Sequence, residues 1–320
     1  MGFDYHLPKE KIAQSPAIPR DSCKLLVLNG ERIEHRKFSE IIHYVKEGDA
    51  IVLNNSKVMK VRLFGRKETG GKIEILIVGK RENEYEALIK GKIREGTKFY
   101  INEYEGEVVR RENGKCIIQL PLEMEEIEKI GNMPTPPYIK REVEKDEWYQ
   151  TVYAKHAGSI AAPTAGLHFT EELLEKIKRK GVQIVFVTLH VGLATFLPPE
   201  RMKNEREYYH ISEEAAEIIN SANNVIAVGT TTVKALESSS KNGRVVASSG
   251  WSNLFIEPGY KFQSPIRGML TNFHMPNSSP LLLTSAFAGK ERIMKAYEEA
   301  LKMDYRFLSF GDVMLILKQY

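Results

Sequence analysis

The chain has 320 residues, of which 42% are hydrophobic and 28% are charged, and these values exclude a disordered or fibrous protein. Its 46 Lys and Arg exceed its 42 Asp and Glu by only four, which permits a nucleic-acid partner without requiring one. The two cysteines, Cys23 and Cys116, are too few for a disulfide framework or a cysteine-rich zinc site. No apolar run is long enough for a signal peptide or a membrane-spanning helix, so the expected location is the cytoplasm.

Residues 1–56 predict short strands and one helix. The runs 25–28 and 50–53 are apolar and have the length of buried strands. Between them, apolar residues recur at helical spacing at Phe38, Ile41, Ile42 and Val45. These are elements of an α/β domain.

The pattern changes to short strands from residue 57 onward. Strands are predicted over 58–66 and 72–78, and two more flank Asn113-Gly114, which is the strongest short hairpin signal. No helical period accompanies them. The segment 57–134 is therefore predicted to be an inserted small antiparallel β-barrel.

Charge is unevenly divided within this segment. Residues 57–98 carry 12 Lys or Arg and 6 Glu, a net of +6, whereas residues 99–134 carry 4 and 8, a net of −4. A solvated strand face explains this asymmetry as well as an electrostatic footprint for a polyanion does.

After the proline-rich stretch 133–139, strands and helices alternate. Helices are predicted after the N-caps Thr170 and Ser212, and over 233–239, 279–287 and 290–303. Strands are predicted over 182–190, 225–229 and 313–317. Residues 1–56 and 135–320 together are thus predicted to form one α/β domain with a mostly parallel sheet, interrupted by the insert.

Four segments place small and polar residues at the ends of strands or before helices, where ligands of α/β proteins gather. They contain Thr164, Gly166 and His168; Thr188 and His190; Thr230 and Thr231; and Asn272 and His274. Each segment also has a plain structural explanation: a tight helix entry, a satisfied histidine, an N-cap and a polar loop tip. The common phosphate-binding glycine motifs are absent, and the eight histidines are scattered without a convincing metal-binding motif, so no metal is expected.

In their order along the chain, these segments resemble the S-adenosylmethionine:tRNA ribosyltransferase-isomerases of queuosine biosynthesis. The most specific matches are AAPTAGLHF at 161–169 and VTLHVG at 187–192. Others are DYHLP at 4–8, RLFGRK at 62–67, PPYIKR at 136–141, YQTVYA at 149–154, GTT at 229–231, LTNFH at 270–274 and FGDVMLI at 310–316. The resemblance therefore extends over nearly the whole chain.

Three positions depart from the family pattern. Asn204-Glu205 stand where the family usually has a Met-His pair, so a role for that histidine does not carry over. Lys60-Val61 replace a Pro-Ala pair before Arg62, and Ala194 replaces a glycine.

The resemblance implies an α/β core of barrel-like form with an inserted antiparallel β-barrel. It also implies a reaction in which the ribosyl group of S-adenosylmethionine is transferred to 7-aminomethyl-7-deazaguanine at the wobble position of a tRNA and rearranged. The product is epoxyqueuosine-tRNA, and adenine and methionine are released. S-adenosylmethionine is then a co-substrate, and no prosthetic group is expected.

Within that frame, roles are assigned as hypotheses. His168, His190 and His274 are the acid–base candidates. Substrate contacts are assigned to Thr164, Gly166, Thr188, Thr230, Thr231 and Asn272. Contacts with tRNA phosphates are assigned to Arg62, Arg66, Lys67 and Lys72. The protein is expected to be a monomer without a membrane partner.

Two other classes of function compete with this one. One is an RNA-binding module without chemistry, which would not need polar loops at strand ends. The other is a barrel-type hydrolase or lyase acting on a phosphorylated sugar, against which the β-rich insert and the missing phosphate motif argue.

Overall fold

The computed structural model describes residues 2–141, 143–193 and 205–318, so the departures at Ala194 and Asn204 lie outside the described residues. The chain divides into two compact units, one of Met1–Lys57 with Pro137–Tyr320 and one of Val58–Pro136. That residues 57–134 fold as a separate inserted domain stays a prediction. No described helix is long and apolar enough to cross a membrane.

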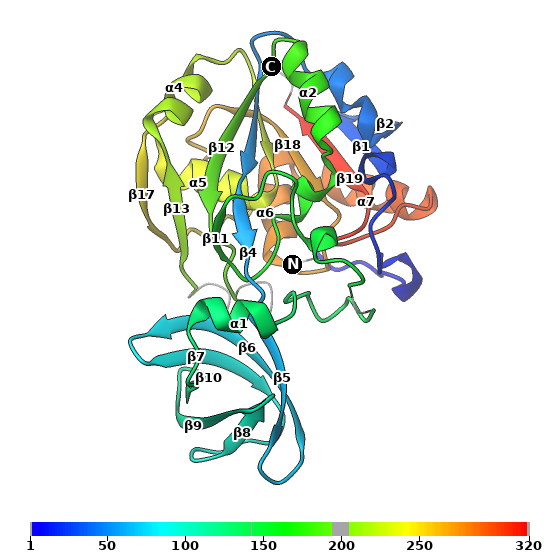
Figure 1. Cartoon of the computed structure of the whole chain (residues 1–320). Coiled ribbons are helices and arrows are strands. Elements are labelled where there is room, and N and C mark those ends of the chain that lie inside the picture. The colour runs from blue at the N-terminus through cyan, green and yellow to red at the C-terminus, as the bar shows by residue number, and fades with distance from the viewer. Residues whose placement is uncertain (1, 142, 194–204, 319–320) are drawn as a thin grey trace. The chain divides into compact units, whose positions relative to one another are not determined.

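The larger unit is organised around a nine-stranded sheet (Figure 1). In spatial order its strands are β17 (Ser248–Ser252), β13 (Glu207–Ile211), β12 (Gln183–Leu189), β3 (Ala50–Asn54), β14 (Val225–Val228), β18 (Ile266–Asn272), β19 (Val313–Leu317), β1 (Lys24–Asn29) and β2 (Arg32–Lys37). Four neighbouring pairs are parallel and four are antiparallel, so the expectation of a mostly parallel sheet is wrong. Three of the four parallel pairs gather at the centre, where β12, β3, β14 and β18 lie side by side, and the fourth joins β19 to β1.

The central strands are buried on both faces, as continuous apolar runs require. Because successive side chains point to opposite faces, β1 sends Leu26 and Leu28 into one hydrophobic cluster and Leu25 and Val27 into the other. The first cluster is shared with α4 (Glu213–Ser221), α5 (Thr230–Ser239), α6 (Ser279–Ala288) and α7 (Lys290–Lys302). The second is shared with α2 (Glu171–Arg179) and the 3₁₀ helix Phe38–Tyr44.

Local sequence signals place several helix starts. The hydroxyl of Thr170 accepts a hydrogen bond from the backbone N–H of Leu173, and that of Ser212 accepts one from Ala215. Both N-cap predictions are confirmed. The remaining short elements are 3₁₀ helices at Lys9–Lys11, Arg20–Ser22, Asp146–Tyr149 and Thr164–His168, and the strands β4 (Ser56–Val58), β11 (His156–Ser159), β15 (Ser240–Lys241) and β16 (Arg244–Val245).

The smaller unit is a closed six-stranded antiparallel barrel, followed by α1 (Met124–Ile130). Its strands, in order around the barrel, are β10 (Lys115–Gln119), β7 (Glu84–Lys90), β6 (Lys72–Arg81), β5 (Arg62–Lys67), β8 (Lys98–Ile101) and β9 (Tyr104–Glu112). Asn113 and Gly114 have φ values of 50° and 79°, as a tight hairpin between β9 and β10 requires, which confirms that prediction. The strand expected over 58–66 is instead split between β4 and β5. The predicted fold class, an α/β core with a small antiparallel barrel, is confirmed.

Candidate active site

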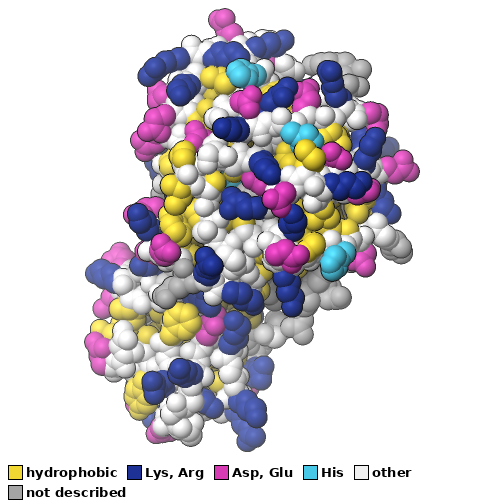
Figure 2. Space-filling view, turned by 90° about the vertical axis from the view of Figure 1, so that its right-hand side faces the viewer, with side chains coloured by type: hydrophobic (Ala, Val, Ile, Leu, Met, Phe, Trp, Pro, Cys, Tyr) yellow, Lys and Arg dark blue, Asp and Glu magenta, His cyan; other side chains and the backbone are white. Residues whose placement is uncertain are grey.

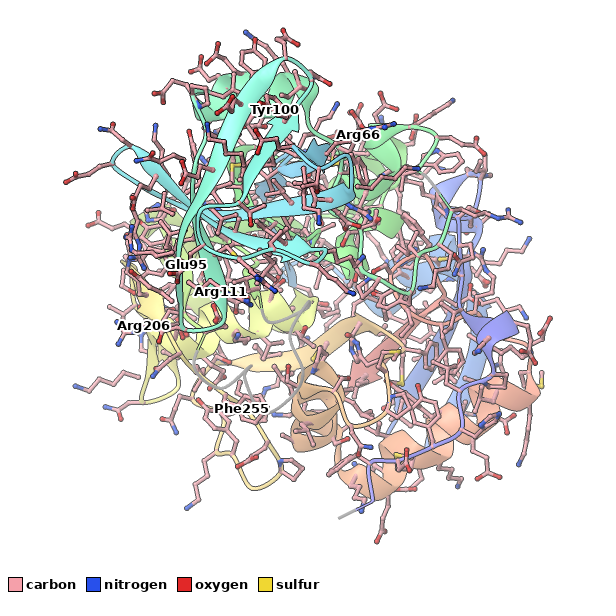
Figure 3. The ribbon with its side chains drawn as sticks, turned by 90° about the horizontal axis from the view of Figure 1, so that it is seen from below. Arg66, Glu95, Tyr100, Arg111, Arg206 and Phe255 are labelled. Atoms are coloured by element: carbon pink, nitrogen blue, oxygen red, sulfur yellow. The ribbon has the colours of Figure 1, made fainter. Side chains whose placement is uncertain are left out.

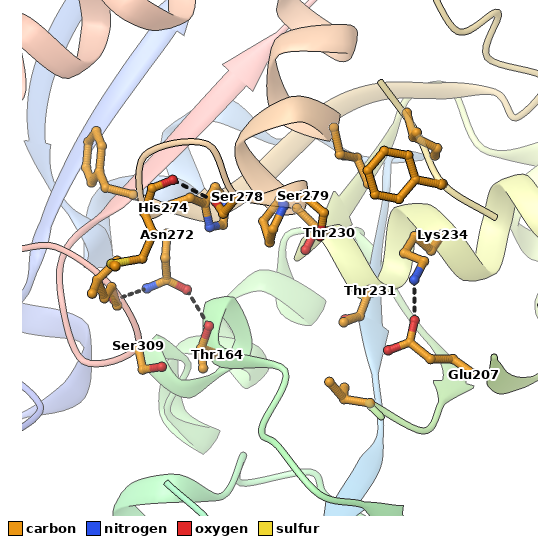
Figure 4. Close-up of a pocket in the computed structure, with 18 of the residues that line it drawn as sticks. Thr164, Glu207, Thr230, Thr231, Lys234, Asn272, His274, Ser278, Ser279 and Ser309 are labelled. Carbon is orange, nitrogen blue, oxygen red and sulfur yellow. Dashed lines mark hydrogen bonds and ion pairs between the residues drawn. The ribbon is translucent and has the colours of Figure 1, made fainter. Parts of the chain in front are cut away.

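A cavity of about 450 Å³ lies at the carboxyl ends of β12, β14 and β18 (Figure 4). Val191 lines it just beyond β12, Thr230 and Thr231 just beyond β14, and Asn272 and His274 at the end of β18. The ends of parallel strands lie on one edge of the sheet, which is why residues far apart in sequence converge there.

Two helices begin at the cavity wall. Gly229, with φ of +88°, turns the chain from β14 into α5, a backbone conformation that few other residues adopt without strain. The first residue of α5, Thr230, and the first residue of α6, Ser279, both line the cavity. Free N–H groups and the positive end of the helix dipole at these starts favour a carboxylate or another anionic group.

Asn272 is the centre of a hydrogen-bond network in the cavity wall (Figure 4). Thr164 Oγ1 donates to Asn272 Oδ1 over 2.9 Å, and Asn272 Nδ2 donates to the carbonyl of Leu308 over 3.1 Å. The same Nδ2 lies 3.2 Å from His168 Nε2. Because Asn272 is only 2% exposed, these contacts hold its amide in one orientation toward the cavity.

His274 lines the cavity and is held from several sides. Its Nε2 lies 2.7 Å from Thr271 Oγ1, its backbone N–H donates to Tyr297 Oη over 2.9 Å, and its carbonyl accepts from Tyr5 Oη. Burial lowers the imidazole pKa to about 3. His274 is therefore neutral at pH 7 and can take part in hydrogen bonds, whereas burial disfavours the protonated, cationic ring.

An ion pair between Glu207 and Lys234 forms another part of the wall (Figure 4). Glu207 Oε2 accepts from Lys234 Nζ, and Glu207 Oε1 accepts from the backbone N–H of Gly192 over 3.1 Å. Glu207 is only 4% exposed and is the only carboxylate among the described lining residues. Neither residue is predicted from the sequence. The one available signal is the Glu-Tyr pair at 207–208, which the resemblance matches to a family Glu-Tyr pair just after Asn204-Glu205.

The other two histidines lie behind the wall and are not among the described lining residues. His168 is buried, with Nδ1 3.3 Å from Cys23 Sγ, and burial together with the charges of Arg306 and Arg20 lowers its pKa to about 3. His190 Nδ1 lies 2.7 Å from Ser56 Oγ, and burial and His156 lower its pKa. Either histidine can influence the cavity only through a neighbour, which for His168 is Asn272.

Gly166 and Thr188 are likewise buried away from the described lining. A Cβ at Gly166 would lie 2.0 Å from Tyr153 Oη, so this glycine allows the tyrosine to pack closely. Thr188 Oγ1 donates to Asn55 Oδ1 over 2.7 Å. In this structure both positions have a packing role.

The four basic residues predicted to contact RNA all lie on the barrel, but they differ in their exposure and in the contacts that they already make within the protein. Arg62 Nε pairs with Glu74 at 2.9 Å and its guanidinium lies over the Phe64 ring. Lys67 Nζ donates to the carbonyl of Lys92 over 3.1 Å. Arg66 and Lys72 are exposed and directly opposite each other in β5 and β6, and Arg66 also faces Tyr100 of β8 (Figure 3).

A second cavity, of about 700 Å³, lies within the barrel unit. Its lining includes one carboxylate, Glu68, and five basic residues: Lys67, Lys92, Arg94, Lys98 and Arg111. Lys98 pairs with Glu105, whereas among the described residues no ion pair joins Lys92, Arg94 or Arg111 to a carboxylate. Arg111 instead lies beside Glu95, whose carboxylate accepts its backbone N–H (Figure 3). Lys and Arg side chains also gather on the face of the barrel that Figure 2 shows. This cavity suits phosphate groups.

In the part of the chain that the structure describes, no group of three or more His, Cys, Asp or Glu is arranged to hold a metal ion. The described lining of the first cavity offers a carboxylate, an ammonium, an imidazole, hydroxyls, an amide and two helix starts.

Comparisons with known proteins match the whole chain. The family model described as queuosine biosynthesis protein matches residues 1–316. Two relatives named S-adenosylmethionine:tRNA ribosyltransferase-isomerase, from Thermoanaerobacter sp. strain X514 and Clostridioides difficile strain 630, are 48% and 49% identical, each over 98% of both chains. A crystal structure of S-adenosylmethionine tRNA ribosyltransferase from Thermotoga maritima is similar, with a TM-score of 0.59, 38% identity, and coverage of 98% of this chain and 99% of that one.

Proposed function

The chain belongs to the queuosine biosynthesis protein family, and we propose that it is an enzyme that transfers and isomerises the ribosyl group of S-adenosylmethionine on a tRNA. The observation that supports this most directly is the first cavity, where helix starts, hydroxyls and a proton-accepting carboxylate meet at the ends of parallel strands. A pure RNA-binding module would not need this arrangement.

In detail, the acceptor is 7-aminomethyl-7-deazaguanine at the wobble position, as the resemblance implies. The sulfonium acidifies the neighbouring 5′ methylene, so a base can remove a proton there. The ribose ring then opens, and adenine leaves as an anion that takes up a proton. Ring opening breaks the C4′–O4′ bond and leaves a vinyl sulfonium, and the loss of adenine turns C1′ into an aldehyde. The neutral aminomethyl nitrogen adds to C4′ and loses its extra proton, and the resulting C5′ carbanion attacks C1′ and closes the five-membered carbocycle. The C1′ alkoxide then displaces methionine from C5′, so that methionine leaves as an uncharged thioether when the epoxide closes. The product is epoxyqueuosine-tRNA.

The residues around the cavity suit these steps. Glu207 is the proposed base for the methylene, and Lys234, paired with it, is placed to supply a proton to adenine. His274 is a second acid–base candidate. Thr230, Thr231 and Asn272 offer hydrogen bonds to ribose or adenine, and Thr164 supports Asn272. The starts of α5 and α6 offer N–H groups to the methionine carboxylate.

The residues behind the wall act as positioning groups in this proposal. His168 orients Asn272, and His190 is held by Ser56, which also contacts Ser159 Oγ at 2.6 Å. We further propose that the protein works in the cytoplasm and as a monomer. Sedimentation of the purified chain would test the monomeric state.

The proposed reaction is tested by adenine release. The purified protein, incubated with S-adenosylmethionine and tRNA carrying the modified base, is expected to release free adenine in an amount equal to the epoxyqueuosine formed. The same tRNA with an unmodified guanine at the wobble position is the control. Tight tRNA binding without adenine release would overturn the enzymatic proposal in favour of a binding module.

The barrel is the proposed contact for tRNA phosphates, through Arg66 and Lys72 and through the basic cavity. Replacing Lys92, Arg94 and Arg111 with glutamine is expected to weaken tRNA binding. The slope of log Kd against log salt is expected to fall by about one for each phosphate that the variant no longer neutralises. A Lys302→Gln change on α7 removes a charge from the other unit and serves as the control. An unchanged slope in the triple variant would place the RNA backbone elsewhere.

A further inference from the structure

A row of three aromatic rings crosses the edge of the large sheet. His190 directly follows β12, Tyr208 is in β13 and Trp251 is in β17, the edge strand. Tyr208 is directly opposite Trp251 in the strand pairing, and the backbone N–H of His190 donates to the carbonyl of Tyr208 over 2.9 Å. The His190 and Tyr208 rings are stacked with centroids 5.8 Å apart, and the Tyr208 and Trp251 rings are 5.7 Å apart at 67°.

The outer end of this row is exposed, although it is a tryptophan, the largest type of apolar side chain. Trp251 is 69% exposed, and Tyr208 is partly exposed. An exposed tryptophan on an edge strand invites unwanted association, so its presence there calls for a binding role. The hydrophobic core accounts for neither ring.

The row is adjacent to the first cavity along the chain. His190 immediately precedes Val191, and Tyr208 immediately follows Glu207, and both Val191 and Glu207 line that cavity. Because side chains alternate along a strand, Glu207 points to the cavity side while Tyr208 points to the other side of β13. The row therefore lies on the side of β13 away from the cavity, and a chain of nucleotides with one base in the cavity would pass the start of β13 to bring its next base to the row.

The charges beside the row favour a polyanion. Arg206, which immediately precedes β13, is exposed (Figure 3). Because it stands two residues before Tyr208, the alternation of an extended chain favours the same side for both side chains. At the other end, His156 lies close enough to His190 to influence its charge, and the neighbouring Lys155 is exposed. A row of neighbouring aromatic rings between basic groups can serve as a platform for unpaired nucleobases, since every base has a face to stack.

We infer that the row of His190, Tyr208 and Trp251 stacks an unpaired base of the anticodon loop, next to the nucleotide that is modified. This inference rests on the proposed function, because it assumes an RNA substrate at the first cavity. It adds a base-stacking site that would select unpaired RNA over a paired helix, whose bases have no free faces.

The test uses the full chain with Trp148→Phe, which leaves Trp251 as its single tryptophan. Titration with an anticodon stem–loop RNA is expected to quench Trp251 emission saturably. The same titration is repeated with a set of RNAs, each of which lacks the base at one loop position. The RNA that lacks the base next to the wobble position is expected to bind without quenching Trp251 emission. Trp251→Ala is expected to weaken RNA binding roughly tenfold, while Trp251→Phe retains most of the affinity and the KM for S-adenosylmethionine stays unchanged in both.

Three results would overturn the inference. One is that the protein binds RNA, as measured by the anisotropy of labelled RNA, while Trp251 emission is not quenched and Trp251→Ala leaves the RNA affinity unchanged. Another is a dimer in sedimentation that Trp251→Ala converts to a monomer with unchanged RNA affinity, since the row would then contact a second copy. The third is quenching that no single abasic position removes. Adenine release by the same preparation is measured first, so a failure of the proposed function is recognised separately.

Discussion

Replacing Glu207 with glutamine is expected to slow adenine release in a single turnover by about 10²- to 10⁴-fold, the range for a lost acid–base group. Glutamine keeps the size of the side chain and one carbonyl oxygen for the N–H of Gly192, but it cannot accept the methylene proton. Because Glu207 is the only carboxylate among the described lining residues, no other carboxylate of that wall can replace it. The effect should therefore appear mainly in the chemical step.

Single-turnover rates at saturating S-adenosylmethionine and tRNA measure this effect. Glu205→Gln removes the same charge two residues earlier, from a side chain that does not line the cavity, and is expected to keep the wild-type rate. Thermal melting separates catalysis from folding. A wild-type rate in Glu207→Gln, or a rate lost only in proportion to lost folded protein, would refute the assignment of Glu207 as the base.

Replacing Asn272 with alanine is expected to affect both stability and activity. The change removes the acceptor of Thr164 Oγ1 and the donor to the Leu308 carbonyl, and it leaves these buried groups and His168 without their partner. An unpaired buried polar group costs about 1–3 kcal/mol, so a loss of about 3 kcal/mol in the stability of the α/β unit is expected. The kcat/KM for S-adenosylmethionine is expected to fall at least roughly tenfold, since the cavity also loses an amide that faces it.

Thr164→Val is the matched variant, because it removes one hydrogen bond of the same network and leaves the amide in place. It is expected to lose about 1 kcal/mol of stability, less than Asn272→Ala does. Denaturation curves and initial rates of adenine release measure the two effects. If Asn272→Ala and Thr164→Val lower kcat/KM equally, the Asn272 amide supports the wall without contacting substrate.

Local sequence signals predicted helix starts and the hairpin turn correctly, because neighbouring residues alone determine these features. The caps at Thr170 and Ser212 and the Asn113-Gly114 hairpin depend on groups a few residues away, and each formed as expected. Strand direction is different, because it depends on the path of the chain between strands. The sheet is half antiparallel partly because β19 runs opposite to β18 after the helices α6 and α7, which no local pattern shows.

The rule that ligands gather at strand ends led to segments that contribute to the wall of the first cavity, but not every side chain chosen from them lies in that wall. Asn272 and His274 line the cavity, whereas His168 and His190 lie behind it. The direction of a side chain at a strand end depends on where the strand stops and how the next turn is packed. From sequence spacing alone, the residue at which a strand ends is uncertain by one position. A shift of one position is enough to turn a side chain from the cavity to the opposite face.

By itself, the sequence determined the family, the two kinds of structure within the chain and the segments in which the site lies, because these depend on long ordered motifs and local periodicity. Only the tertiary structure joined Glu207 to Lys234, which are separated by 27 positions and lie on β13 and α5. It likewise aligned His190, Tyr208 and Trp251 into one row across three strands. Contacts of this kind depend on strand order and register, and these are set by packing of the whole sheet rather than by any segment of it.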